Sequence, residues 1–478
     1  MKLTKRDTMP PAEKQSPQTR EPAARPRRGH LLEVRFESLA YGGEAIARHE
    51  GFVLFTRYGA PGEKALVRVG RVKKNYAEAK IVKIIEPAPE RIEPFCPLFT
   101  ICGGCSWQHL PIEVQRSWKQ RIIRDALRSL PGCESIAIRP LVPSPDTWRY
   151  RNKMEFTFSR GEDGKLAGGF HKPANWQEIL DVEHCWLAPE SMERILRAAV
   201  AEGDRQRLSA WDPRVHKGTL RQLVLRHCVE TQEILALLLT ADDNLDFSAF
   251  QDALFAAEPA LSGIAWGRNA GKSDVARADE IYKTAGKDSF EERLGDFRFN
   301  ISLGSFFQTN TRGAEKLYDI VREDLELTGR ETVLDAYCGT GTIGIYCGRN
   351  ARQVLGIELS REAVWDARSN AATNGMDNAL FLPGDMKKTL PVLLSAVEGR
   401  IDRLVVDPPR GGMDKKALAQ LLDLQAPVLV YVSCNPSTMA RDLEAALKAG
   451  YTIDHLTPVD LFPQTYHVEC VARLTRRP

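Results

Sequence analysis

The stretch VLDAYCGTGTIG, residues 333–344, decides the fold of the C-terminal part of the chain. An apolar run that contains Asp335 leads into glycines at positions 339, 341 and 344, and a helix-like segment follows. Glycine lets the backbone turn sharply and approach a ligand closely, near the N-terminus of the next helix. A Gly-rich turn is weak evidence when it stands alone, so the surrounding sequence has to identify the ligand.

Strand-like and helix-like runs alternate from residue 331 to the C-terminus. Apolar runs such as QVLGIEL, RLVVDPP and PVLVYVSC are separated by helix-like segments such as REAVWDARSNAATNG and STMARDLEAALKAG. Repeated β–α units of this kind imply a parallel sheet with helices on both faces. We therefore predict an α/β, Rossmann-like domain over residues 301–478.

Acidic residues follow the predicted strands of this domain. Glu358 ends the second strand, 23 residues after Asp335, a spacing that places an acid near ribose hydroxyls. Asp385 lies at the end of the third strand, where it would reach an adenine amino group, and Asp407 precedes a Pro-Pro turn at the fourth. Ligands of such sheets bind beyond the carboxyl ends of the strands, so these acids converge on one crevice. The spacing of the first two acids fits a dinucleotide or S-adenosylmethionine (AdoMet), and the later two favour AdoMet over a dinucleotide. The alternative role of each acid taken alone is to cap a helix in a tight turn.

Cys434 lies in YVSCNPSTMA, residues 431–440, between a strand-like run and a helix-like segment. A thiol in such a place is a small buried hydrophobe, a metal ligand or a nucleophile. At a strand-to-helix junction the N–H groups of the following helix would favour the thiolate. Its neighbours in sequence favour the nucleophile.

The ordered set of Asp335 with its Gly-rich turn, Glu358, Asp385, Asp407-Pro-Pro and Cys434 resembles the RNA uracil-C5 methyltransferases. The resemblance extends to GSFFQTN (304–310) and HVEC (467–470) and covers most of residues 300–478. It implies that Cys434 is the nucleophile and that Glu469 is the general base. It also implies a set of AdoMet-binding residues, namely Gln308, Tyr337, Gly339, Thr342, Glu358, Asp385 and Asp407.

The chemistry of uracil methylation accounts for these residue types. Carbon C5 of uracil is a poor nucleophile, and a thiolate that adds at C6 converts the ring into an enolate able to attack a methyl sulfonium. A general base must then remove the C5 proton before the thiolate leaves. Methyltransferases that act on amino groups of bases also carry Asp/Asn-Pro-Pro, but an aromatic residue follows it. Here Arg410 follows, and amino methylation has no role for a nucleophilic Cys434.

Four cysteines form a second candidate site. The segment CPLFTICGGC contains Cys96, Cys102 and Cys105, and DVEHCW offers Cys185 as the fourth ligand. Four thiolates suit zinc or an iron–sulfur cluster, and the spacing of the first three departs from the usual paired zinc arrangement. In the methyltransferase family the segment resembles one that binds a 4Fe–4S cluster, which we prefer to zinc. His184 and Cys133 are reserve candidates.

The N-terminal part is basic, since residues 1–90 contain 18 Lys/Arg against 11 Asp/Glu. We predict a disordered basic tail over 1–28 and a small β-barrel over 29–88. ESLAYGGEAIAR (37–48) and APGEKALVRV (60–69) resemble a TRAM domain, an OB-like RNA-binding barrel. The residues expected to contact RNA are the cations Arg71, Lys73, Lys74 and Lys83 and the aromatic residues Tyr41, Phe52 and Tyr76.

Residues 89–300 complete the predicted organisation as a central α+β domain with the clustered cysteines, and part of 111–145 is expected to pack on the catalytic domain. No apolar run reaches the roughly 18 residues of a membrane span, and the first thirty residues lack the apolar segment of a secretory signal, so we expect a cytoplasmic protein. The sequence does not determine the oligomeric state, for which we prefer a monomer.

The predicted function is AdoMet-dependent methylation of a uridine in RNA. A TRAM-like domain together with four cysteines resembles the family members that modify 23S ribosomal RNA. The alternatives are methylation of transfer RNA and, from another class, a non-catalytic RNA-binding or ribosome assembly factor.

Overall fold

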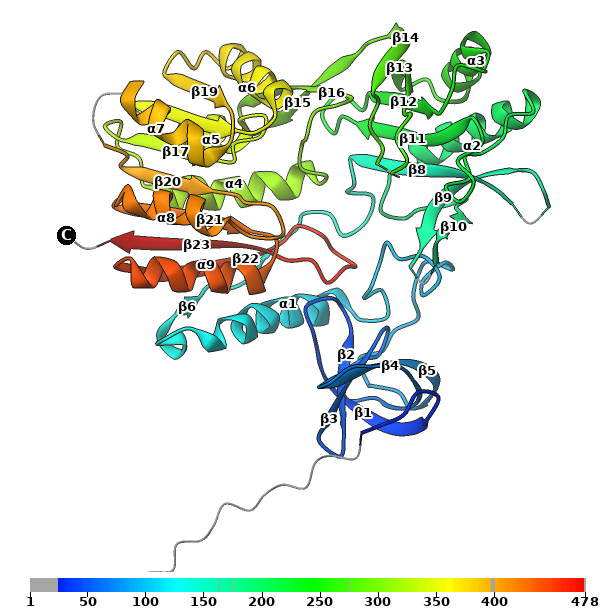
Figure 1. Ribbon diagram of the computed structural model, residues 1–478, viewed down its shortest axis with the longest axis horizontal. Helices are drawn as coiled ribbons and strands as arrows, with labels where there is room; N and C mark the ends of the chain where they lie inside the picture. The colour runs from blue at the N-terminus through cyan, green and yellow to red at the C-terminus, as the bar shows by residue number, and fades with distance from the viewer. Residues whose placement is uncertain (1–24, 162, 174, 274, 397–399, 477–478) are drawn as a thin grey trace, which may run out of the picture. The chain divides into compact units, whose positions relative to one another are not determined.

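The structure is a computed structural model that describes residues 25–161, 163–173, 175–273, 275–396 and 400–476 (Figure 1). The predicted basic tail over 1–28 therefore lies largely outside the described residues.

Nine strands form a mixed sheet in the C-terminal part. They are β6 (Ala137–Ile138), β7 (Val142–Pro143), β17 (Thr332–Ala336), β18 (Gln353–Glu358), β19 (Ala379–Pro383), β20 (Arg403–Val406), β21 (Val428–Ser433), β22 (Tyr451–Asp460) and β23 (Glu469–Arg476). The order is β19-β18-β17-β20-β21-β23-β22-β6, and β7 also pairs with β22. Strands β17 to β21 run parallel, while β23 is antiparallel to both of its neighbours. The predicted parallel sheet is confirmed, and an antiparallel β23 is added to it.

Helices cover both faces of this sheet. They are α1 (Ile112–Ala126), α4 (Thr311–Leu325), α5 (Thr342–Gly348), α6 (Arg361–Thr373), α7 (Met386–Ala396), α8 (Lys415–Asp423) and α9 (Pro436–Lys448). Successive strand residues point to opposite faces. Val333 accordingly packs with α4, α5 and α6, whereas Leu334 packs with α1, α7, α8 and α9. Each face is therefore a separate apolar core, as a doubly wound fold requires.

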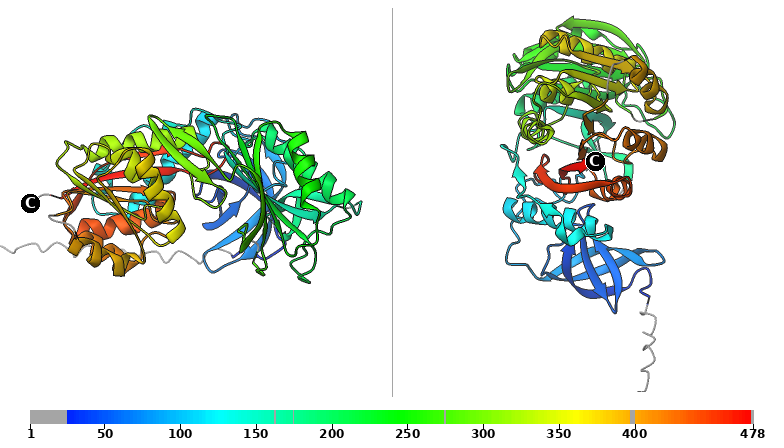
Figure 2. Two further views of the ribbon diagram at one scale, coloured as in Figure 1. Left: turned by 90° about the horizontal axis from the view of Figure 1, so that it is seen from above. Right: turned by 90° about the vertical axis from the view of Figure 1, so that its left-hand side faces the viewer.

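A second sheet has seven strands in the order β10-β9-β8-β11-β12-β13-β14. They are β8 (Lys153–Arg160), β9 (Leu166–Lys172), β10 (Asn175–Asp181), β11 (Leu220–His227), β12 (Ile234–Thr240), β13 (Leu261–Arg268) and β14 (Glu280–Gly286). Helices α2 (Glu190–Arg205) and α3 (Phe247–Ala257) pack on it, which forms the expected α+β region. The hairpin of β15 (Ser289–Leu294) and β16 (Phe297–Ser302) follows, and two short 3-10 turns lie at Leu127–Ser129 and Cys133–Ser135. Figure 2 shows the two sheets side by side.

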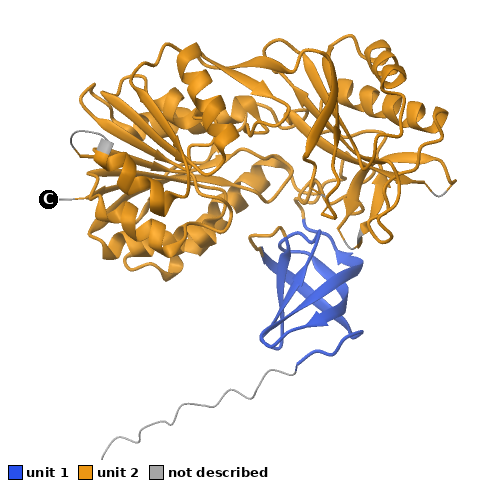
Figure 3. Cartoon of the chain, turned by 45° about the horizontal axis from the view of Figure 1, so that its top comes forward, with its two compact units in different colours: residues 1–38, 44–88 blue, residues 39–43, 89–478 orange. Residues whose placement is uncertain are grey.

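The contacts divide the chain into two compact units (Figure 3). One comprises residues up to Ser38 together with Glu44–Ala88, and the other comprises Leu39–Gly43 and the chain from Pro89 onward. Both sheets described above belong to the second unit. The expected boundary at residue 301 does not separate compact units, so it stays a prediction.

The first unit is built on a closed barrel with the strand order β1-β2-β3-β5-β4. Its strands are β1 (Leu31–Leu39), β2 (Ala45–His49), β3 (Phe52–Thr56), β4 (Lys64–Val72) and β5 (Tyr76–Glu86). Alternate side chains such as Val34, Phe36 and Leu54 fill the interior, as the alternating sequence pattern requires. The predicted small barrel is confirmed. Phe52, which we expected to stack on RNA, is instead buried in this interior with 8% exposure.

Within the described part of the chain, no helix combines the length and the apolar character that a membrane crossing requires.

Candidate active site

The strand order of the nine-stranded sheet reverses between β17 and β20. In open α/β sheets the crevice beyond the carboxyl ends of the strands at such a reversal is the usual ligand site. Tyr337 and the Gly-rich turn follow β17, Glu358 ends β18, Asp385 follows β19, Asp407 follows β20 and Cys434 follows β21. The topology therefore places the predicted residues along one edge, which we call the catalytic edge.

The Gly-rich turn between β17 and α5 depends on two left-handed glycines. Gly339 has a φ of +55° and Gly341 a φ of +78°, and a Cβ on Gly341 would lie only 3.0 Å from the Cβ of Ala367. A Cβ on Gly339 would meet nothing within 4 Å, so space is open in front of the turn. The Gly339 amide donates a hydrogen bond to Oε2 of Glu358 at 3.2 Å. This bond joins the turn to the acid that the sequence predicts near the ribose hydroxyls.

Asp335 contacts this turn from the protein interior. Its carboxylate is fully buried, and Oδ2 accepts a hydrogen bond from the Gly344 amide at 2.8 Å. Burial raises the pKa of Asp335 to about 8, and the charges of Asp407 and Glu358 add to the rise. Asp335 therefore holds the turn in shape from inside the protein.

The other predicted cofactor residues lie at the ends of separate elements. Gln308 is half-buried in the segment before α4, and its carbonyl accepts a hydrogen bond from Nδ2 of Asn152 at 2.8 Å. Thr342 opens α5, and its hydroxyl lies 3.2 Å from that of Tyr318. The Asp385 carboxylate accepts from the Lys387 amide at 3.0 Å and remains partly exposed.

Cys434 and Glu469 are brought together by the pairing of β21 with β23. Ser433 lies opposite Cys470 in this antiparallel ladder. Cys434 follows Ser433 and Glu469 precedes Cys470, so the same register puts Cys434 and Glu469 on adjacent strands at the same level. Cys434 is half-buried and Glu469 is 5% exposed.

Burial, together with neighbouring charges, raises the pKa values of the acids at this site. Burial raises the pKa of Glu469 to about 8, with the charge of Asp407 adding to it, and burial raises that of Asp407 to about 6. Burial also raises the pKa of the Cys434 thiol to about 11, with Glu469 and Asp407 adding to the rise. The expected stabilisation of the thiolate is thus outweighed, first by burial of the thiol and then by the charges of the two carboxylates. Arg410 opposes this by lowering the pKa values of both Cys434 and Glu469.

Several side chains around Cys434 were not predicted as site residues. The hydroxyl of Tyr41, assigned above to RNA stacking, donates to the Cys434 carbonyl at 2.8 Å, and its ring contacts Tyr466 edge-on. His467 lies 4.1 Å from Tyr466 between ring centroids, and burial next to Arg410 lowers the pKa of His467 to about 3. His467 is therefore a neutral ring two residues before Glu469. Its place in the HVEC motif was the signal that pointed to it.

The four predicted metal ligands come from two separate segments and influence one another. Burial raises the pKa of Cys105 to about 12, with Cys185 and Cys102 adding to it, and burial also raises the pKa of Cys102, with Cys96 contributing. Among the described residues, however, no three or more His, Cys, Asp or Glu side chains are arranged to hold one metal ion.

Two buried donors near these thiols have no hydrogen-bond partner among the described residues. They are Nε of Arg151, whose charge lowers the pKa values of Cys102, Cys105 and Cys185, and the indole N–H of Trp186. Buried donors are normally paired, so the unpaired Nε of Arg151 beside three of the thiols fits an anionic group there.

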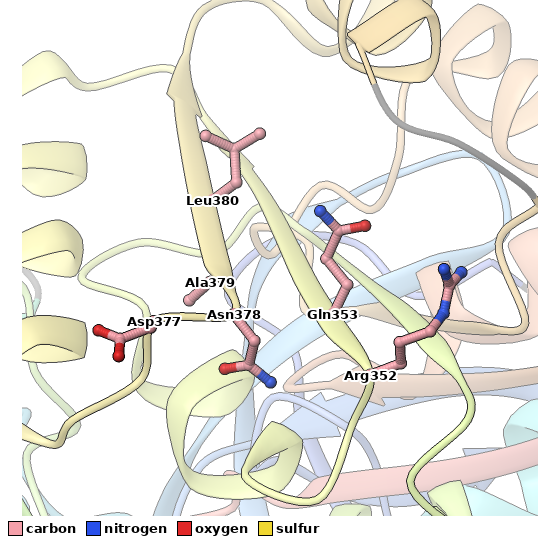
Figure 4. Close-up of a pocket in the computed structure, with 6 residues that line it drawn as sticks. All are labelled: Arg352, Gln353, Asp377, Asn378, Ala379 and Leu380. Atoms are coloured by element: carbon pink, nitrogen blue, oxygen red, sulfur yellow. The ribbon is translucent and has the colours of Figure 1, made fainter.

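A pocket elsewhere on the nine-stranded sheet is not part of this site. It is lined by Arg352, Gln353 and residues 377–380, at the amino ends of β18 and β19 (Figure 4). The catalytic edge lies at the opposite ends of these strands.

Comparison with known proteins gives three kinds of match. A family model described as tRNA (uracil-5-)-methyltransferase matches residues 273–383 and 394–477, and a TRAM domain model matches residues 25–82. An uncharacterized RNA methyltransferase of Chlorobaculum tepidum is 37% identical over 94% of this chain and 97% of its own length. One from Clostridium tetani is 37% identical over 94% and 99%.

Among solved structures, the chain is similar to the tRNA (uracil-54, C5)-methyltransferase of Pyrococcus abyssi in complex with S-adenosyl-L-homocysteine. The TM-score is 0.74 at 29% sequence identity, and the match covers 93% of this chain and 100% of the other.

Proposed function

Because the chain belongs to the family of AdoMet-dependent RNA uracil-5-methyltransferases, we propose that Cys434 and Glu469 carry out its reaction on one specific uridine. AdoMet, when bound, supplies the electrophilic methyl group. The register of β21 and β23 is the observation that supports the two roles, since it puts a thiol and a carboxyl side by side at the catalytic edge.

The chain's own residues would act in a fixed order. The Cys434 thiolate would bond to C6 of uracil, and the electron pair released to C5 would form the new C5–methyl bond while the bond between that methyl group and the sulfur of AdoMet breaks. The Glu469 carboxylate then takes the C5 proton, the C5–C6 double bond re-forms and the C6–sulfur bond breaks, which returns the thiolate. The base needs its carboxylate form, and burial raises the pKa of Glu469 to about 8, so part of the Glu469 population is ionised near neutral pH.

The catalytic edge fits AdoMet in its donor set. Glu358 and Asp385 offer carboxylates to hydroxyl and amino groups, and the space in front of Gly339 admits a ligand next to the backbone. We propose that these two acids, Gln308, Tyr337, Gly339, Thr342 and Asp407 bind the cofactor.

The substrate we propose is a uridine of 23S ribosomal RNA. The match to a TRAM domain and the four cysteines of the second site support it, because both features are expected together in rRNA-modifying members. A transfer RNA uridine is the second candidate, and the similarity to the Pyrococcus abyssi tRNA enzyme favours it. Mapping of 5-methyluridine in both RNAs, in cells with and without the gene, distinguishes them. The proposal predicts one lost site in 23S rRNA, and a loss confined to tRNA contradicts it.

We also propose that Cys96, Cys102, Cys105 and Cys185 hold a 4Fe–4S cluster. The electrostatic interactions among the four thiols, and the unpaired Nε of Arg151 beside three of them, support an anionic group. Zinc on the same thiolates is the alternative.

Trapping of the covalent adduct tests the mechanism. Fluorine at C5 cannot be abstracted as a proton, so RNA with 5-fluorouridine should form a denaturation-resistant adduct with the wild-type protein and AdoMet. The variant Cys434→Ala should form none. A wild-type protein that binds RNA but traps nothing would instead indicate the non-catalytic RNA-binding or assembly factor.

A further inference from the structure

Residues 461–468 connect β22 to β23 and lead directly to Glu469, and we call them the base loop. The loop has no regular secondary structure, yet most of its side chains are buried, including those of Leu461, Gln464 and Val468. A buried loop needs hydrogen-bond partners for its backbone. In this loop those partners come from elements far apart in the sequence.

Four successive carbonyls of the base loop each have a different donor. The Leu461 carbonyl accepts from Nδ2 of Asn310 at 2.8 Å, and that of Phe462 accepts from Nζ of Lys119 at 2.9 Å. The Pro463 carbonyl accepts from the Tyr150 hydroxyl at 2.9 Å. These three donor side chains are all nine-tenths buried or more.

The fourth carbonyl belongs to Gln464 and connects the loop to the cysteine-bearing segment. It accepts from the backbone amides of Ser106 at 3.0 Å and Trp107 at 3.1 Å, directly after Cys105. The Ser106 hydroxyl in turn accepts from the Tyr466 amide at 2.9 Å.

Gln464 itself has an unusual backbone. Its φ is +68°, in the left-handed region that residues with a Cβ rarely adopt, and it is 5% exposed. Such conformations persist where the surroundings over-determine them, and they cluster at functional sites. Here Gln115 of α1 supplies the constraint. Its Oε1 accepts from the Gln464 amide at 2.9 Å, and its Nε2 donates to Oε1 of Gln464 at 3.0 Å.

We propose that Gln115 and Gln464 are positioning residues for the general base, holding the base loop so that Glu469 meets the C5 proton of the uracil. The proposal rests on the role of Glu469 proposed above. Ser106 and Trp107 give the cysteine-bearing segment a share in the same task, because they hold the carbonyl of Gln464.

The order of the reaction steps distinguishes a positioning role of Gln115 and Gln464 from a general structural role. Addition of Cys434 and methyl transfer need the catalytic edge alone, whereas proton abstraction also needs Glu469 at the right distance. A loosened base loop should therefore slow only the last stage, and methylated RNA should stay bonded to Cys434.

The test compares two rates in each variant. Trapping of 5-fluorouridine RNA measures addition and methyl transfer, and turnover of ordinary RNA also includes proton abstraction. Gln464→Gly removes the side-chain bond to Nε2 of Gln115, keeps the backbone amide and suits the positive φ, so it should fold. Gln115→Leu removes the partner on α1.

We expect turnover to fall by roughly 10- to 100-fold in both variants, within the range of a mispositioned general base, while trapping stays within about 2-fold of wild type. Ordinary RNA should then accumulate as a covalent adduct. Gln120→Ala, on the same helix, should behave as wild type in both assays.

Equal losses of trapping and turnover in Gln464→Gly, or wild-type turnover in it, would overturn the proposal. If Gln115→Leu does not fold, Gln464→Gly still decides. Glu469→Gln separates the assignment of the general base from the positioning role of the two glutamines. If it also fails to accumulate adduct, the assignment of the base is wrong. If it accumulates adduct and Gln464→Gly does not, only the positioning role is wrong.

Discussion

Cys434 and the four cysteines at 96, 102, 105 and 185 are all half-buried thiols, and they differ mainly in their neighbours. Cys434 lies beside two carboxyl groups and the exposed Arg410, at the end of a strand. The four cysteines lie near one another and near Arg151, in loops. Burial raises the pKa at both places, so burial does not tell a nucleophile from a ligand.

The neighbours make the distinction. A thiol next to a carboxyl that can take a proton is equipped for a cycle of addition and elimination. Thiols that face other thiols and unpaired buried donors are equipped to hold a group that carries negative charge. Cysteine variants at the two places should therefore fail in different ways.

The largest effect is expected for Cys434→Ala. Loss of the nucleophile should lower turnover by about 10⁴-fold or more and abolish the adduct, because the other two thiols near this edge, Cys338 and Cys470, are buried. Methyl transfer to RNA is the assay, and iron content should stay at the wild-type level. The half-buried Cys133 is the matched control, and Cys133→Ala should keep full activity. Substantial activity in Cys434→Ala would rule out the covalent route.

Glu469→Gln should have the next largest effect. An amide cannot accept the C5 proton, so turnover should fall by roughly 10²- to 10⁴-fold while covalent RNA accumulates. Gel separation of protein–RNA adducts under denaturing conditions measures it. Normal turnover in this variant would place the base on another residue.

Cys105→Ser tests the four cysteines in the way that Cys434→Ala tests the nucleophile. Loss of one of four ligands should remove most of the iron and sulfide from protein purified without oxygen, whereas Cys434→Ala and Cys133→Ala should retain both. Because Ser106 and Trp107 follow Cys105 and hold Gln464, turnover should also fall, by about 10-fold. Zinc in place of iron and sulfide in the wild-type protein would contradict the cluster.

The smallest expected effect is a shift in the pH dependence of kcat/KM. Glu469 with a pKa of about 8 and Cys434 with one of about 11 act in their deprotonated forms, so kcat/KM should rise from pH 6 to 9. The positive charge of Arg410 lowers both pKa values. In Arg410→Gln both should rise and move the profile to higher pH by about one unit, a roughly tenfold loss at pH 7.5. Arg400→Gln, at an exposed ion pair with Asp402, should leave the profile unchanged. An unshifted profile in Arg410→Gln would mean that the guanidinium does not act on either group.

Much of the fold could be predicted because its signals are local. The alternation of apolar strands and helices, the Gly-rich turn and the acids at strand ends all follow from short-range backbone rules. The barrel was predictable for the same reason. The family assignment is confirmed, while the roles of individual site residues and the choice of RNA stay predictions.

Contacts between distant segments could not be predicted. Nothing in the sequence near Tyr41 connects it to Cys434, and the expected stacking role followed only from its place in a barrel-like motif. The sequence near Gln115 likewise has no mark of its partner Gln464. The raised pKa of Cys434 was missed because the helix that follows it is visible in the sequence, whereas the burial of the thiol and the two carboxylates near it are not.

The sequence by itself thus determined the elements, the order of the strand-end residues and the types of reactive group, because these depend on neighbours along the chain. The tertiary structure alone decided which groups meet. It set Cys434 against Glu469 through the register of the antiparallel strand β23, which lies between β21 and β22. It also brought the cysteine-bearing segment to the base loop through hydrogen bonds that only a folded chain can form.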